Sequence, residues 1–284
     1  MVISGKELAA KLKAEMAVQV ATFPEKYGRV PHLVVILVGN DPGSQTYVRN
    51  KEKACEVVGF KHTTYRLPEE TSEQEVLDRI SELNADNSVD GILVQLPLPR
   101  HISETKVIET ISREKDVDGF HPLNTAALWQ KRPNPNCIVP CTPMGIIKLL
   151  EAADVEIAGK NAVVLGRSQI VGLPISKLLL DRNATVTICH SRTKDLAEVT
   201  RQADILVAAI GQAKFVTGDM VKDGTAVIDV GMDLDENGKL CGDVDFASVE
   251  PKASVITPVP GGVGPMTICC LMSNTIQCFL ASRV

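Results

Sequence analysis

Four polar side chains in the first half of the sequence have types and spacings suited to chemistry on an organic substrate. Tyr47 and Lys51 lie four residues apart in a segment whose apolar spacing indicates a helix, so their side chains share one face of it. Gln95 lies within GILVQLPLP, an apolar segment that we interpret as a buried strand, where an amide needs a hydrogen-bond partner or a functional role. Asp118 follows Asp116 in the acidic turn EKDVDGFHP. Taken singly, each also fits an ordinary structural role on an amphipathic helix or in a turn.

A glycine-containing turn in the second half suggests a phosphate site. Gly166 and Gly172 flank the turn in VVLGRSQIVGLPISKLLL, between a buried strand and an apolar-periodic helix. A Rossmann fold presents backbone N–H groups and a helix N-terminus to a phosphate at this point. The spacing is not G-x-G-x-x-G, so a plain strand-to-helix turn remains the alternative.

The end of the next strand bears on the choice of dinucleotide. NAD-preferring sites usually carry an acid there for the ribose hydroxyls, but this sequence has His190, Ser191 and Arg192. A hydroxyl and a guanidinium, with Arg167 in the turn, suit a 2′-phosphate through charge-assisted hydrogen bonds. NADP is therefore favoured over NAD, although Arg192 alone also fits a solvated loop.

The composition is that of a soluble globular protein. The chain has 284 residues, of which 44% are hydrophobic and 23% charged, with a net charge of −5 and scattered basic residues. Nucleic acid and anionic membranes are poor partners for such a surface. The longest apolar run, Leu33 to Val38, is far shorter than the roughly 20 residues of a membrane span. The N-terminus lacks the apolar region of a signal peptide, which predicts a cytoplasmic protein. Eight cysteines without zinc-ligand spacing predict reduced thiols and no metal site.

The elements that must position these residues form two α/β domains. In the first domain, residues 1–140, Ser4 and Glu7 have capping-box spacing and open a helix to about Phe23. Strands are expected at 32–39, 62–67 and 91–99, with helices at 44–58 and after the second capping box at Ser72 and Glu75. This alternation predicts a parallel, helix-covered sheet.

The second domain, residues 141–265, has a Rossmann-type pattern. A proline-rich linker at 131–145 precedes it, and Thr142 and Pro143 indicate a helix start, with the threonine as N-cap. Expected strands are 161–166, 184–190, 204–211 and 225–231, and expected helices are 170–181 and 195–202. A last helix, 266–284, is expected to pack back on the first domain.

Five ordered motifs together resemble a known family. SQTYVRNK (44–51), VQLPLP (94–99), KDVDGFHPLN (115–124), GRSQIVGLP (166–174) and PVPGGVGPMT (258–267) are similar to the bifunctional methylenetetrahydrofolate dehydrogenase/methenyltetrahydrofolate cyclohydrolase family, in matching order over nearly the whole chain. The chain resembles the short bacterial form, which lacks a formyltetrahydrofolate synthetase domain. The resemblance implies NADP-dependent oxidation of 5,10-methylenetetrahydrofolate and hydrolysis of the product to 10-formyltetrahydrofolate.

The same resemblance implies roles for single residues. Lys51 is the catalytic lysine, Gln95 its partner, Tyr47 the ring that stacks on the folate, and Asp118 the carboxylate that holds the pterin. A lysine helps hydration only if burial or a nearby positive charge lowers its pKa toward neutrality. The resemblance also implies a cleft between the domains and a homodimer through the nucleotide domains. The folate side is lined by Ser44, Val94, Leu96, Pro260, Gly261, Gly262, Val263 and Gly264. The NADP side is lined by Gly166, Arg167, Ser168, Ser191, Arg192 and Met232.

Three other interpretations stay open at this point. Short-chain dehydrogenases also use Tyr-x-x-x-Lys, but their glycine-rich turn precedes that pair, whereas Gly166 follows Lys51 here. A shikimate-like NADP-dependent dehydrogenase has the two-domain plan but needs neither VQLPLP nor a pterin carboxylate. A non-catalytic NADP-binding protein would bind the nucleotide without turnover.

Overall fold

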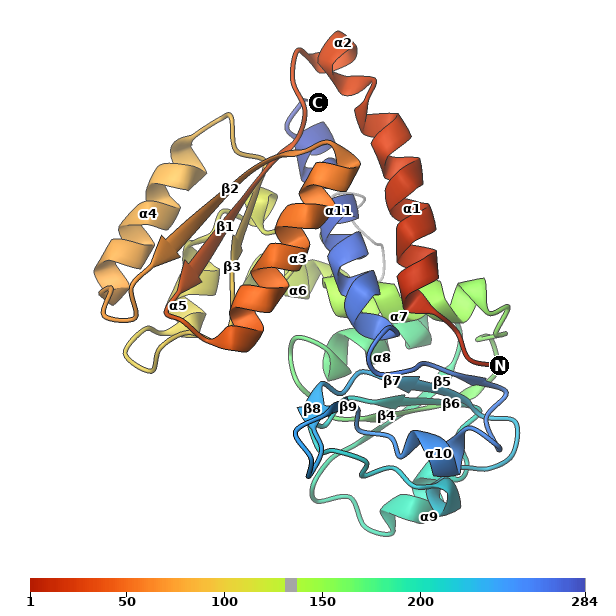
Figure 1. Ribbon diagram of the computed structural model, residues 1–284. Coiled ribbons are helices and arrows are strands. Elements are labelled where there is room, and N and C mark those ends of the chain that lie inside the picture. The colour runs from red at the N-terminus through yellow and green to blue at the C-terminus, as the bar shows by residue number, and fades with distance from the viewer. Residues whose placement is uncertain (131–136, 284) are drawn as a thin grey trace. The chain divides into compact units, whose positions relative to one another are not determined.

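The computed structural model describes residues 1–130 and 137–283, so part of the linker expected at 131–145 lies outside the described residues. The chain divides into two compact units (Figure 1). The five-stranded unit consists of Met1–Ala10 and Pro140–Thr267, and the three-stranded unit consists of Lys11–Val139 and Ile268–Val284. The helices α1 (Gly5–Val20) and α11 (Val263–Ala281) each contain residues of both units.

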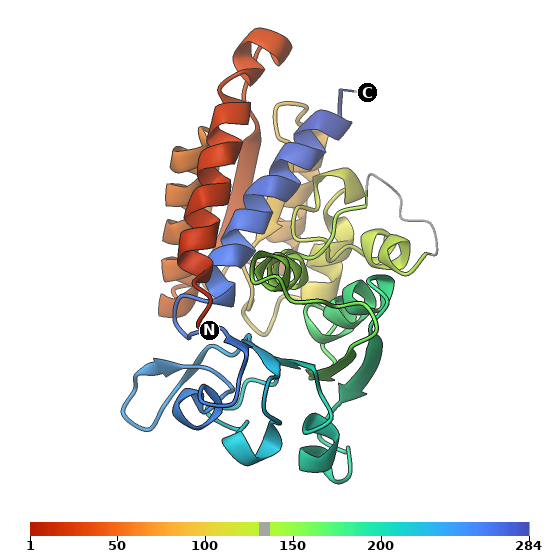
Figure 2. The same ribbon diagram turned by 90° about the vertical axis from the view of Figure 1, so that its right-hand side faces the viewer.

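The three-stranded unit has a parallel sheet in the order β2-β1-β3. Its strands are β1 His32–Val38, β2 Lys61–Leu67 and β3 Gly91–Val94. Its other helices are α2 Phe23–Tyr27, α3 Pro42–Val58, α4 Glu73–Ala85, α5 Glu104–Thr110 and α6 Pro122–Leu128, with a 3-10 turn η1 at Arg113–Lys115. The chain steps from β1 to β2 in one direction and returns past β1 to β3, so right-handed crossovers place α3 and α4 on opposite faces (Figure 1; the same ribbon is turned by 90° in Figure 2). Every residue of β1 is buried, as expected for a central strand covered on both faces.

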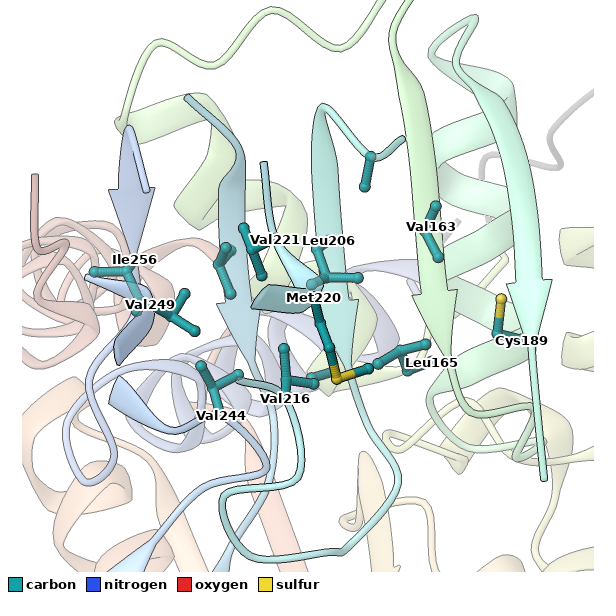
Figure 3. Close-up of a cluster of buried hydrophobic side chains, with 13 residues drawn as sticks. Val163, Leu165, Cys189, Leu206, Val216, Met220, Val221, Val244, Val249 and Ile256 are labelled. Atoms are coloured by element: carbon teal, nitrogen blue, oxygen red, sulfur yellow. The ribbon is translucent and has the colours of Figure 1, made fainter. Parts of the chain in front are cut away.

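The five-stranded unit has a parallel sheet in the order β10-β7-β6-β4-β5. Its strands are β4 Asn161–Leu165, β5 Thr185–Cys189, β6 Ile205–Ala208, β7 Ala226–Asp229 and β10 Val255–Ile256, with an antiparallel pair β8 Asp233–Leu234 and β9 Leu240–Cys241. Its helices are α7 Cys141–Ala152, α8 Gly172–Asp181, α9 Leu196–Thr200 and α10 Phe246–Val249, with a 3-10 turn η2 at Gly218–Met220. Buried aliphatic side chains from β4, β6 and β7 form a core with residues of the following loops (Figure 3). This is the expected α/β architecture.

The order of these strands creates a switch point. The chain leaves β4 for β5 on one side and later enters β6 on the other side, so β4 pairs with both. In open parallel sheets, ligands bind outside the carboxyl ends of the strands where the order reverses. The carboxyl ends of β4 and β6, after Leu165 and Ala208, mark that place.

Several local expectations need correction. The strand expected at 91–99 ends at Val94, because Pro97 and Pro99 have no N–H to continue a ladder; Gln95 is the first residue after it. The α7 helix has Pro140 as its N-cap without a side-chain bond, and the hydroxyl of Thr142 instead lies 2.9 Å from that of Thr267. The first helix ends at Val20.

The apolar character of α11 along its whole length was not predicted from the sequence. By length and composition this helix is able to span a membrane, but 67% of an 18-residue window along it is buried within the protein. In the three-stranded unit, its Asn274 amide donates to the carbonyls of Val117 and Val139, at 2.9 Å each. The burial and these bonds are those of a core helix.

Candidate active site and nucleotide site

A buried lysine and an amide form the chemical centre of the three-stranded unit. Lys51 lies on α3 with 8% of its surface exposed, and its Nζ donates to Oε1 of Gln95 at 2.8 Å. The amide nitrogen of Gln95 donates to the carbonyl of Leu96 at 2.6 Å, which turns its oxygen toward the lysine. The backbone N–H of Gln95 donates to Ile36 of β1 at 2.8 Å. The amine is therefore held by a side chain whose own position is fixed from both ends.

The helix α3 places Tyr47 one turn before Lys51. Asp41 caps the helix by accepting from the N–H of Ser44 at 2.7 Å, and Pro42 occupies its first turn. Ser44 is buried, and Tyr47 is partly buried. Burial raises the pKa of the Tyr47 phenol, so near neutral pH this side chain offers a neutral hydroxyl and a ring face.

Asp116 builds the turn that carries Asp118. Its buried carboxylate accepts from the backbone N–H groups of Gly119, Phe120 and His121 at 3.1, 3.2 and 2.8 Å. The amide of Asn124 adds a fourth donor at 2.8 Å. Burial raises the pKa of Asp116, while the four hydrogen bonds act in the opposite direction. Sequence reasoning assigned this residue to turn chemistry, and the hydrogen bonds agree with that interpretation.

The structure brings three of the expected folate residues together. Asp118, Val94 and Leu96 line a small cavity of about 10 Å³, together with Asp116 and Phe120. A space of that size holds about one water molecule. Asp118 thus lines the same cavity as Val94 and Leu96, the residues on either side of Gln95.

The turn after β4 requires glycine at both expected positions. Gly166 has a φ of +109°, and a Cβ there would lie 2.2 Å from the carbonyl oxygen of Ala209. A Cβ on Gly172 would lie 2.3 Å from the carbonyl oxygen of Gly166. The hydroxyl of Ser168 accepts from the N–H groups of Val171 and Gly172 at 3.2 and 3.3 Å, so it orders the turn that precedes α8. The backbone is thereby shaped for close approach of another group at the switch point.

The basic side chains expected to contact NADP lie along the same edge. Leu165 and Cys189 are paired at the carboxyl ends of β4 and β5, and Arg167 and Arg192 follow them within three residues. Arg167, Ser191 and Arg192 are all exposed. Residues 189–193, which follow β5 from its last residue, contain no acidic side chain, and this is the feature on which the choice of NADP over NAD rests. These groups suit a phosphate ester better than a bare ribose.

The remaining expected residues belong to the five-stranded unit. Met232 is 48% exposed and follows β7. In the segment 260–264, Gly261 has a φ of +107° and its carbonyl accepts from the N–H of Lys6 at 3.0 Å. A Cβ on Gly5 would lie 1.8 Å from the carbonyl oxygen of Gly262, so the loop packs tightly on the start of α1. Pro260, Val263 and Gly264 belong to the same loop, whose backbone conformation these contacts hold in place. Among the described residues, no cluster of metal-ligating side chains occurs.

Comparisons with known proteins agree with this arrangement. One family model, "Tetrahydrofolate dehydrogenase/cyclohydrolase, catalytic domain", matches residues 3–118, and a second, the NAD(P)-binding domain of the same family, matches residues 140–283. The bifunctional protein FolD of Streptococcus agalactiae is 56% identical over 280 residues, which is 99% of this chain and 98% of the relative.

Two solved structures are similar over their full lengths. The bifunctional enzyme FolD from Campylobacter jejuni is 47% identical with a TM-score of 0.94, covering 100% of this chain and 99% of that one. The Trypanosoma brucei methylenetetrahydrofolate dehydrogenase-cyclohydrolase, complexed with NADP cofactor and inhibitor, is 41% identical with a TM-score of 0.95, covering 100% and 98%. The resemblance drawn from the five sequence motifs is confirmed, and this chain belongs to the tetrahydrofolate dehydrogenase/cyclohydrolase family.

Proposed function

We propose that this chain oxidises 5,10-methylenetetrahydrofolate to 5,10-methenyltetrahydrofolate with NADP⁺ and hydrolyses that product to 10-formyltetrahydrofolate. The observation that carries the proposal is the buried pair of Lys51 and Gln95, with Nζ and Oε1 2.8 Å apart. A buried, oriented amine is what the hydrolytic step requires, and family membership supplies the substrate class.

Hydrolysis depends on moving a proton. The methenyl substrate is cationic, and a water molecule that attacks its bridging carbon must lose a proton as the C–O bond forms. The bond from that carbon to N5 then breaks, N5 takes up the proton of the new hydroxyl, and the carbon stays on N10 as the formyl group. In its neutral form, the amine of Lys51 accepts the proton that the attacking water loses, and it lies buried beside the Gln95 oxygen. Gln95 holds the amine in place through its fixed oxygen.

Two side chains orient the substrate. The pterin has adjacent ring N–H and amino donors, which the Asp118 carboxylate accepts together. The ring face of Tyr47 covers the flat aromatic system, and its raised pKa keeps the phenol neutral. We assign Ser44, Val94 and Leu96 to the folate pocket because Ser44 lies on α3, Val94 ends β3 and Leu96 follows Gln95. The loop 260–264 is assigned to the same substrate on family resemblance.

The turn at Gly166 fits NADP. Two glycines that tolerate no Cβ shape the strand-to-helix turn, and Ser168 orders it. We assign Ser191 and Arg192 to the 2′-phosphate, together with Arg167, because they follow the paired carboxyl ends of β5 and β4. Met232 is assigned to the nicotinamide side. When bound, the nucleotide supplies a hydride acceptor, and the protein's own contribution to oxidation is to align the two rings.

Assembly and location are also proposals. We infer a homodimer through the five-stranded units and a cytoplasmic protein from family resemblance. The division into a catalytic domain at 1–140 and a nucleotide domain at 141–265 likewise stays a prediction. Sedimentation of the purified protein tests the dimer.

The two alternative functions make different predictions about turnover. A shikimate-like dehydrogenase reduces NADP⁺ with shikimate, and a non-catalytic binding protein reduces it with neither substrate. We expect NADPH formation with 5,10-methylenetetrahydrofolate and none with shikimate. Reduction with shikimate alone would replace the proposed function with the first alternative, and binding of NADP⁺ without any reduction would replace it with the second.

A further inference from the structure

Two buried carboxylates lie behind the loop that follows β6, next to the switch point. The N–H of Ala209 donates to Leu165 of β4 at 2.9 Å, and the Ala209 carbonyl is the atom that excludes a Cβ from Gly166. Residues 209–212 therefore form the wall of the switch point opposite the Gly166 turn. The course of this loop decides how a nucleotide fits there.

Asp243 fixes this loop by its side chain. Asp243 is completely buried. Its Oδ2 accepts from the N–H of Ile210 and its Oδ1 from the N–H of Gln212, both at 2.7 Å. A buried N–H without a partner is costly, so these two hydrogen bonds favour this course of the loop. A single carboxylate thus satisfies two donors from alternate residues of one loop.

Asp229, at the end of β7, holds Asp243 in turn. Its Oδ1 accepts from the N–H of Asp243 at 2.9 Å, and its Oδ2 accepts from the N–H of Val244 at 3.0 Å. Gly242 fits only because it lacks a side chain, since a Cβ there would lie 1.9 Å from Oδ2 of Asp229. The β7 end, the segment 242–244 and the loop 209–212 are thereby joined in series by two carboxylates.

We propose that Asp243, held by Asp229, is a positioning residue of the NADP site that sets the loop 209–212 before the nucleotide binds. The inference rests on the proposed nucleotide site at the Gly166 turn. The sequence analysis predicted a role for neither aspartate: Asp229 lies in the apolar segment TAVIDVG, and Asp243 lies in GDVDF. A buried acid at a strand end was the signal that could have identified Asp229.

The substitution Asp243→Asn tests the proposal. An amide has one acceptor oxygen, so one of the two loop N–H groups faces an NH₂ and loses its partner. Leaving a buried donor unsatisfied corresponds to a factor between about five and a hundred in an equilibrium constant. We expect the KM for NADP⁺ to rise by a factor within that range. Cyclohydrolase activity, which consumes no nucleotide, stays within about twofold of the wild type. Asp235→Asn is the matched control, because Asp235 also accepts from two backbone N–H groups, of Asn237 and Lys239, in the turn between β8 and β9.

The outcomes separate this proposal from the proposed function. If the wild type uses NADP⁺ and Asp243→Asn leaves its KM unchanged, the positioning role is wrong and the nucleotide site stands. If dehydrogenase and cyclohydrolase fall equally, Asp243 serves general folding and the proposal is overturned. If the wild type does not use NADP⁺, the proposed function itself fails.

A measurement on the wild type covers the case in which Asp243→Asn does not fold. We expect hydrogen exchange at Ile210 and Gln212 to be slow without NADP⁺ and to change little when it is added. Fast exchange that becomes slow only with NADP⁺ would mean that the nucleotide orders the loop, which contradicts the proposal.

Discussion

The substitution Lys51→Met removes the amine from the proposed hydrolytic centre and keeps most of its surroundings. Methionine retains a long, unbranched apolar stem, so the packing of this position on α3 is largely preserved. What is lost is the hydrogen bond of 2.8 Å to Gln95 and the group that takes a proton from water. Gln95 is itself only partly buried and keeps its bond to Leu96, so water can replace the missing donor.

The expected magnitudes differ strongly between catalysis and stability. Loss of a general base costs about 10²- to 10⁴-fold in rate, which corresponds to roughly 3 to 5 kcal/mol of transition-state stabilisation. Loss of one partly exposed hydrogen bond costs about 1 kcal/mol of unfolding free energy, or a Tm decrease of about 2–4 °C. The oxidation step needs aligned rings but no protein base at the reacting carbon. Cyclohydrolase activity should therefore disappear while dehydrogenase activity stays measurable.

The assay follows the methenyl intermediate by its absorbance. With 5,10-methylenetetrahydrofolate and NADP⁺, Lys51→Met should accumulate 5,10-methenyltetrahydrofolate, whereas the wild type should not. Lys53→Met, an exposed lysine on the same helix, is the matched control and should behave as the wild type. Gln95→Ala should shift the two activities in the same direction as Lys51→Met. Hydrolysis of methenyltetrahydrofolate by Lys51→Met at the wild-type rate would refute the role given to the amine.

Three further predictions concern the substrate, the cofactor and stability. Asp118→Ala should weaken both activities through folate binding and leave NADP⁺ affinity intact; an NADP⁺-specific loss would contradict its role. Arg192→Ala should reduce the preference for NADP⁺ over NAD⁺ in kcat/KM, and a wild type equally fast with both would argue against a 2′-phosphate site. Lys222, 2.6 Å from Asp204, is the largest cause that lowers the pKa of that carboxyl below 3.8. A carboxyl whose pKa is lowered in the folded protein stabilises the fold at pH values above its pKa in the unfolded chain, and this stabilisation is lost as the pH falls through the folded pKa. The Tm difference between the wild type and Lys222→Met should therefore be constant above about pH 5 and shrink in more acidic solution. A Tm difference independent of pH would exclude the ion pair as its cause.

The sequence predicted a helix or strand well where its own residues, or those next to it, carry the signal. Ser72 and Glu75 form the expected capping box, with each side chain bonded to the other's backbone N–H. The apolar segment at 32–39 is the fully buried β1. The two capping residues lie three positions apart, and an unbroken apolar run such as β1 calls for burial on both faces, so in both cases the sequence pattern contains the physical cause.

The sequence was less informative where a distant partner decides the structure. Thr142 has the residue type of an N-cap, but its hydroxyl bonds to Thr267, 125 residues away. The apolar stretch after Gly91 suggested a longer strand than the four residues that pair with β1. Asp243 is a further example, because its role depends on the N–H groups of Ile210 and Gln212 about 30 residues earlier.

For the candidate site, the sequence predicted which side chains take part better than it predicted which residues hold them in place. The resemblance named Lys51 and Gln95 as partners, and they are bonded at 2.8 Å. Nothing in the spacing of Asp116 and Asp118 indicated that the first would bind three backbone N–H groups and so build the turn that carries the second. A buried carboxylate such as Asp116 holds the turn in place, but in the sequence it looks like an ordinary turn residue.

Product analysis of the wild-type reaction tests the central claim most directly. With 5,10-methylenetetrahydrofolate and NADP⁺ as the only reactants in water, we predict that NADPH and 10-formyltetrahydrofolate form in equal amounts and that Lys51→Met forms NADPH with methenyltetrahydrofolate instead. Formation of 10-formyltetrahydrofolate by Lys51→Met in step with NADPH, as in the wild type, would contradict the assignment of both steps to one pocket with Lys51 as the base.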